Sequence, residues 1–145
     1  TQPTIDDVNL AILEKSDQIL LILAHEMASV LSARRALDIF SGLGFPVEKT
    51  AIVINGVIRN PKLPRDHIQM ALGYPILTTI PHDPEILVRA IDQGVPAALS
   101  NPNSAAPGTI EILAYHLSQP GEEERLNGQM PEALARVKKR LEVRR

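Results

Sequence analysis

Polar side chains follow two apolar runs near the middle of the 145-residue chain. Asn55 and Gly56 follow the first run, residues 51–54, and Pro81-His82-Asp83 follow the second, residues 76–80. If the two runs are parallel neighbours in one sheet, these residues lie beyond its carboxyl edge, where open α/β sheets bind ligands. An asparagine amide donates and accepts hydrogen bonds at once, which is the chemistry that reads a purine edge. The sequence therefore places its candidate ligand site here.

Asp83 and Pro84 also form a helix-start pattern. An aspartate at the N-cap accepts hydrogen bonds from first-turn amides. A proline at the first helical position loses no helical hydrogen bond, because an amide there would have no partner within the helix. We expect Asp83 to cap a helix whatever else it does. Because a helix N-terminus presents amides to polar ligand groups, a capping role and a binding role for His82 and Asp83 are compatible.

The motifs of several enzyme classes are missing from the sequence. It contains no G-x-x-x-x-G-K-[ST] and no G-x-G-x-x-G, so no loop of these kinds cradles phosphates. It also lacks a G-x-S-x-G elbow, an H-E-x-x-H helix and any cysteine. The histidines at positions 25, 67, 82 and 116 do not have the spacing of metal ligands, and Asp92 and Glu111 read as helix-surface charges. We expect neither a catalytic residue nor a metal site.

Composition fits a single ordinary globular domain. The net charge is −2, so no overall positive field recruits nucleic acid, and aromatic residues make up only 3% of the chain. No apolar run reaches the ~20 residues that span a bilayer. The polar, acidic first residues do not resemble a signal peptide, and with the absence of cysteine they predict a cytoplasmic protein.

Helical and strand-like segments alternate along the chain, which predicts an α/β fold. Strands are expected at residues 18–24, 50–54 and 75–80, and helices at 5–15, 28–43, 64–72, 84–93 and 109–117, with an extended connector over 95–108. Thr4 is the expected cap of the first helix. Because the run at 18–24 is almost continuously apolar, it suits a parallel sheet covered on both faces. We predict a three-layer α-β-α parallel sheet, Rossmann-like or P-loop NTPase-like, over residues 1–119.

Asn55-Gly56 leaves one local alternative open, because this dipeptide is a strong hairpin signal. The other connections look helical, and Pro61 and Pro64 shorten the return run, so a strand followed by a loop is favoured.

Beyond this domain we expect a linker over residues 120–130 and a basic amphipathic tail helix over 131–145. The tail has six basic and two acidic residues, a net charge of +4. Such a helix suits an anionic membrane surface. Its narrow apolar face lacks Trp and Phe, however, which favours a solvated helix or one that docks on a partner.

Taken together, these segments resemble the second half of the ParA/MinD-type P-loop ATPases, in particular the CpaE/TadZ-like pilus-assembly branch. The resemblance covers roughly Ile5 to Leu117. It rests on the order of four segments: Lys15-Ser-Asp17-Gln-Ile-Leu-Leu-Ile-Leu-Ala24, Thr50-Ala-Ile-Val-Ile-Asn55, Ala71-Leu-Gly-Tyr-Pro-Ile-Leu-Thr-Thr-Ile-Pro-His-Asp83 and Val88-Arg-Ala-Ile-Asp-Gln-Gly-Val-Pro96.

The resemblance implies that Asn55, Pro81, His82 and Asp83 surround the adenine of ATP, which the intact ATPase binds with magnesium. Gly56 departs from the family, in which a basic residue is common at this position. The family's Walker A lysines, switch regions and magnesium-binding acid all belong to a part that precedes this segment. The resemblance thus implies the C-terminal part of an ATPase that positions pilus or secretion machinery, in the cytoplasm or peripheral to the inner membrane. This part keeps the adenine side of the site and is inactive alone.

Two other interpretations stay open: a non-enzymatic α/β interaction or self-association module, and a small Rossmann-like nucleotide-binding domain. In the family, the strand at 18–24 lies beside the P-loop strand. Left unpaired it is an exposed edge, so we expect self-association through it. Pilus or secretion proteins, and a membrane surface contacted through residues 131–145, are the other expected partners.

Overall fold

Helices and strands alternate along the first part of the chain in the computed structural model, which describes residues 6–117, 135–137, 139 and 142. The chain divides into two compact units, residues 1–79 and 80–145. The elements are α1 (Asp7–Lys15), β1 (Ile19–Ala24), α2 (Met27–Gly42), the 3-10 helix η1 (Val47–Lys49), β2 (Thr50–Val57), α3 (Arg65–Leu72), β3 (Ile76–Pro81), α4 (Pro84–Gln93), α5 (Ala97–Ser100) and α6 (Ala105–Leu117).

The three strands form one sheet with β2 at its centre. β1 and β2 run parallel, with Ile19 opposite Thr50 and Ala24 opposite Asn55. A helix lies between each strand and the next, as parallel neighbours require. The prediction of an α/β fold with a parallel sheet is confirmed.

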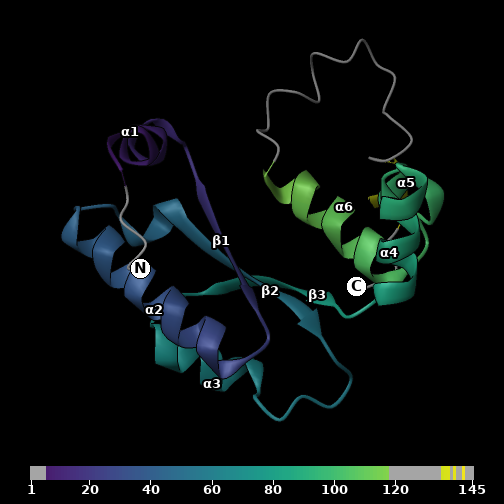
Figure 1. Ribbon diagram of the computed structural model, residues 1–145, viewed down its shortest axis with the longest axis horizontal. Coiled ribbons are helices and arrows are strands. Elements are labelled where there is room, and N and C mark those ends of the chain that lie inside the picture. Colours follow the sequence, from purple (N-terminus) through teal and green to yellow (C-terminus); the bar gives the residue numbers. More distant parts are fainter. Residues whose placement is uncertain (1–5, 118–134, 138, 140–141, 143–145) are drawn as a thin grey trace. The chain divides into compact units, whose positions relative to one another are not determined.

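In the first unit, α2 and α3 lie side by side against β1 and β2 (Figure 1). The cluster at this contact consists of apolar strand and helix side chains: Ile19, Leu23, Val30, Ala33, Leu37, Phe40, Ile52, Ile54, Ile68, Leu72 and Ile76. Each large aliphatic side chain buried in this way stabilises the fold by about 1.5–3 kcal/mol. The cluster therefore holds β1 and β2 in place, together with the residues that follow them.

β2 does not turn back at Asn55-Gly56, so the hairpin alternative is wrong. The strand runs on to Val57, and Gly56 lies within it at φ 76, in the left-handed region. The positive φ that a hairpin turn would need is present. In this structure the positive φ of Gly56 produces only a local departure from the extended backbone, and the strand continues beyond it.

The caps of α1 and α4 differ from the predicted ones. Asp6 caps α1, since its Oδ1 accepts a hydrogen bond from the Asn9 amide at 2.7 Å; the predicted cap, Thr4, lies outside the described residues. Asp83 does occupy the N-cap position of α4, but its side chain makes no capping hydrogen bond. The predicted helix start is confirmed and the predicted hydrogen bond is wrong.

The predicted extended connector over residues 95–108 is also wrong, because it contains α5 and the start of α6. Pro107 lies in the first turn of α6, where a missing amide hydrogen has no intrahelical partner to lose. The first helical bond follows directly, from the Gly108 amide to the Ser104 carbonyl at 3.0 Å. The predicted linker at 120–130 lies outside the described residues, and the described positions of the predicted tail are helical.

Substituting Gly56 with alanine should lower the free energy of unfolding by about 1 kcal/mol, because an L residue is strained at a positive φ. Gly42→Ala is the matched control: Gly42 is the last residue of α2, and a Cβ there would meet nothing within 4 Å. Urea unfolding should show a loss for Gly56→Ala and no loss for Gly42→Ala. An equal loss in both would contradict the assigned backbone conformation.

Candidate functional site

The carboxyl end of β1, Ala24, lies opposite Asn55 of β2, and β2 continues for two more residues to Val57. Directly after β1, the His25 amide donates a hydrogen bond to the Asn55 carbonyl at 3.2 Å. The five residues of β2 before Asn55 are buried, whereas Asn55 itself is exposed. The sheet thus fixes the backbone of Asn55 while its amide side chain faces outward. This combination of a rigid backbone and an exposed donor and acceptor suits recognition of a heterocyclic base edge.

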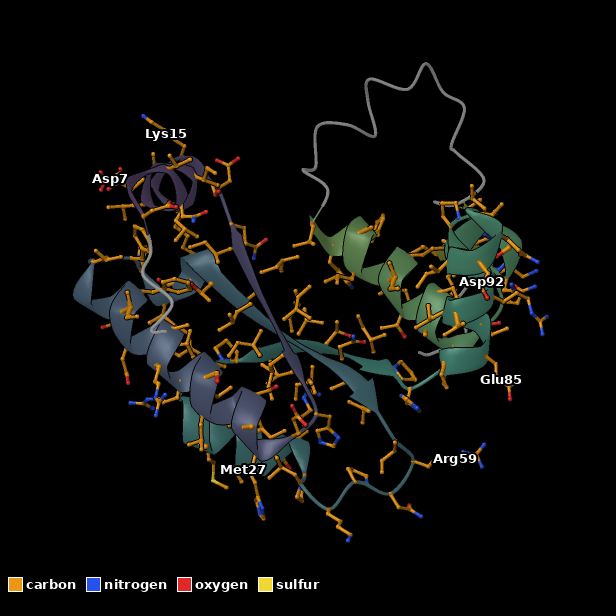
Figure 2. The ribbon with its side chains drawn as sticks, in the orientation of Figure 1. Asp7, Lys15, Met27, Arg59, Glu85 and Asp92 are labelled. Carbon is orange, nitrogen blue, oxygen red and sulfur yellow. The ribbon has the colours of Figure 1, made fainter. Side chains whose placement is uncertain are left out.

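Residues 58–64 form the loop that leads from the end of β2 at Val57 to α3. Near its end, Leu63 packs against the core, and its carbonyl accepts a hydrogen bond from His25 Nε2 at 2.7 Å. Two cations, Arg59 and Lys62, are exposed on this loop, and Figure 2 shows Arg59 projecting from it. The loop is therefore anchored at one end by His25 and offers positive charge to solvent.

Two side chains of α3 hold the start of β3. The Arg65 guanidinium donates to the Ile76 carbonyl at 2.6 Å, and Gln69 Oε1 accepts from the Ile76 amide at 3.2 Å. Both backbone polar groups of Ile76 are satisfied in this way by one helix. Neither residue stands out in the sequence, because nothing about an arginine or glutamine in a helix marks a bond to a strand.

Pro81, His82 and Asp83 lie where β3 ends and α4 begins. His82 is exposed, and Pro81 and Asp83 are half-buried. Because the Asp83 side chain does not cap α4, it leaves the first-turn amides without that partner. Of the predicted site residues, these three adjoin one another in the second unit, whereas Asn55 belongs to the first.

His25 is a site residue that sequence reasoning missed. Its place directly after a predicted strand was visible, but its contact with Leu63 spans 38 positions. The described residues contain no group of three or more His, Cys, Asp and Glu that could hold a metal ion. Within the same part of the chain, no helix is long and apolar enough to cross a membrane.

Glu111 is not the surface charge that the sequence suggested. Only 8% of it is exposed, and its Oε1 accepts a hydrogen bond from Arg136 Nη2 at 2.7 Å. Val137, on the predicted apolar stripe of the tail, is 2% exposed. The described part of the tail therefore packs within the second unit rather than being wholly solvated. Asp92 is exposed, as predicted (Figure 2).

Solved structures share the fold of this chain. A ParA family ATPase from Chlorobium tepidum TLS superposes with a TM-score of 0.72 at 25% sequence identity, over 79% of this chain and 48% of the ATPase. The fold is of the ParA/MinD type. A chain of the MinC:MinD cell division protein complex of Aquifex aeolicus superposes with a TM-score of 0.63 at 21% identity, over 80% of this chain and 50% of that one.

The chain thus spans about half the length of these two ParA/MinD-type structures. No protein-family profile matches it, and no curated protein sequence matches it significantly.

The Glu111–Arg136 pair provides a test of how the tail is held. Arg136→Met should lower the free energy of unfolding by about 1–3 kcal/mol, because it takes a charged partner from a carboxylate whose side chain is 6% exposed. Asp38→Asn is the matched control, since the Arg34–Asp38 pair is 52% and 61% exposed and should contribute under about 0.5 kcal/mol. Urea unfolding compares them, and equal effects would contradict the docked tail.

Proposed function

We propose that this chain supplies the adenine side of the nucleotide site of a ParA/MinD-type ATPase. The observation that carries the proposal is the exposed Asn55 amide on a backbone fixed in the central strand, opposite the carboxyl end of β1. The proposal assigns base recognition to Asn55 and, by the family resemblance, to Pro81, His82 and Asp83. The solved ParA family ATPase supports an ATP-binding assignment, since it shares the fold of this chain.

The residues present fit the base of ATP but not its phosphates or magnesium. A triphosphate needs a nest of backbone amides and a lysine, and the 145 residues contain no Walker A sequence that would supply them. No acidic cluster among the described residues is suited to a divalent cation either. We propose that a P-loop outside these residues completes the site, and that this chain alone does not hydrolyse ATP.

The wider role follows from the resemblance. We propose a cytoplasmic ATPase of the CpaE/TadZ-like branch, which positions pilus or secretion machinery through protein partners at the inner membrane. The Aquifex aeolicus chain was solved in a MinC:MinD complex, which supports protein partners for such folds. The proposal includes membrane contact through residues 131–145. That contact must leave Arg136 paired with Glu111.

An NMR titration of the isotopically labelled chain with adenosine tests base recognition. Adenosine should shift the side-chain amide signals of Asn55, and Asn55→Ala should raise the apparent Kd about 5–10-fold, the loss of about one hydrogen bond. Asn9→Ala, which removes another exposed asparagine amide, should leave the Kd unchanged. The absence of any shift with adenosine or ATP would favour the interaction module instead.

Self-association through β1 is a second candidate function. Among the described strands, β1 lies at the edge of the sheet, and its Ile22 side chain is 58% exposed. An unpaired apolar edge is a template for another strand, and we propose that a second copy of this chain occupies it.

Light scattering at rising protein concentration tests this candidate. We expect the wild-type chain to form a dimer and Ile22→Lys to weaken it at least about tenfold, because a lysine on an edge strand opposes pairing with another strand, where the two copies would bring like charges together. Met70→Lys is the control, since Met70 is 73% exposed on α3 and away from the edge strand. A wild-type chain that stays monomeric throughout would contradict the proposal.

A further inference from the structure

We propose that His25 is a positioning residue for this site: it clamps the loop of residues 58–64 beside Asn55, so that the loop forms a wall for the bound base. The inference rests on the proposed function and adds a residue to it. His25 itself contacts no base in this account. It acts through the segment that it holds.

The clamp consists of two hydrogen bonds from one residue. The His25 amide donates to the Asn55 carbonyl at 3.2 Å, and its Nε2 donates to the Leu63 carbonyl at 2.7 Å. Asn55 lies in β2, two residues before the strand ends at Val57, and Leu63 lies near the far end of the loop, just before α3. A single residue after β1 therefore joins β2 to the far end of the loop.

Between the end of β2 at Val57 and Leu63, the chain has no other hydrogen-bonded support. Residues 58–62, all of which the structure describes, make no hydrogen bond of their own. The backbone of Gly56 has a φ of 76. At Pro61 the proline ring fixes φ. The conformation of the loop thus depends on its ends, and the Leu63 end is held by the packing of Leu63 on the core and by the side chain of His25.

An imidazole suits this task because of its reach and its donor. The Leu63 carbonyl can only accept, so Nε2 must carry a hydrogen, as it does in the neutral Nε2–H tautomer and in the imidazolium. Phenylalanine has a ring of similar size and no donor. Glutamine has no ring but places an amide donor at a similar distance. These two substitutions therefore separate the donor from the shape.

The clamp affects binding by preorganisation. Without it, the backbone of Asn55 stays paired with β1, but Arg59, Asn60 and Lys62 sample more conformations and must be ordered when a ligand binds. Ordering a loop on binding lowers affinity without removing any contact. A purely structural histidine would instead change the stability of the fold and leave the loop as it is.

The full 145-residue chain and its His25→Phe, His25→Gln and His67→Phe variants test the proposal, with adenosine as the ligand. His25→Phe should raise the adenosine Kd about 5–10-fold and lower the ¹⁵N heteronuclear NOE of residues 58–62, with residues 51–54 unchanged. His25→Gln should restore both measurements to within about twofold of wild type, because it restores the donor. His67→Phe, at an exposed histidine of α3, should change neither.

Equal impairment by His25→Phe and His25→Gln, or wild-type affinity and loop NOE values in His25→Phe, would overturn the role of His25 alone. Failure of the wild-type chain to bind adenosine would overturn the proposed function, and the positioning role with it. His25→Leu, also without a donor, takes the place of His25→Phe if the aromatic variant does not fold.

Discussion

The parallel pairing of β1 with β2 is the constraint on which the rest of the structure depends. It sets Ala24 against Asn55, and it brings His25 to the one position from which its amide reaches the Asn55 carbonyl. Since the period of a strand is two, a shift of one residue would turn the Asn55 side chain to the other face. The apolar cluster beneath α2 and α3 opposes this shift, because it would take Ile52 and Ile54 out of that cluster. Packing on one face of the sheet thus secures the orientation of a polar group on the other.

Recognition of the base and binding of the phosphates have different structural requirements. Base recognition requires a few polar groups on a rigid edge, and β2 supplies that with Asn55. Phosphate binding requires a loop of amides and a lysine, which has no counterpart in these 145 residues. In the proposed function, the chain forms half of a nucleotide site: its own core holds the base side, and residues outside it bind the phosphates.

Features that depend on local periodicity could be predicted from the sequence. The apolar runs became β1, β2 and β3, and helices formed at the ranges expected for α2, α3 and α4. The abrupt change from apolar to polar residues identified where burial ends, at Asn55, but not where β2 ends, since the strand runs on to Val57 rather than stopping at residue 54.

Contacts between distant residues could not be predicted. The His25–Leu63 hydrogen bond joins residues 38 positions apart, and the Glu111–Arg136 pair joins residues 25 positions apart. The residues next to His25 and Glu111 in the sequence do not indicate which carbonyl or guanidinium each one contacts. Local rules also failed where tertiary structure decides: Asn55-Gly56 has the residues of a hairpin turn, yet β2 continues through it.

Photoaffinity labelling of the chain with 8-azidoadenosine measures most directly whether it holds the adenine side of a nucleotide site. Peptide mapping by mass spectrometry should place the label within residues 55–63 or 81–86, and excess adenosine should remove it. Labelling that adenosine does not compete away, or that maps instead to α1 or α6, would contradict the account.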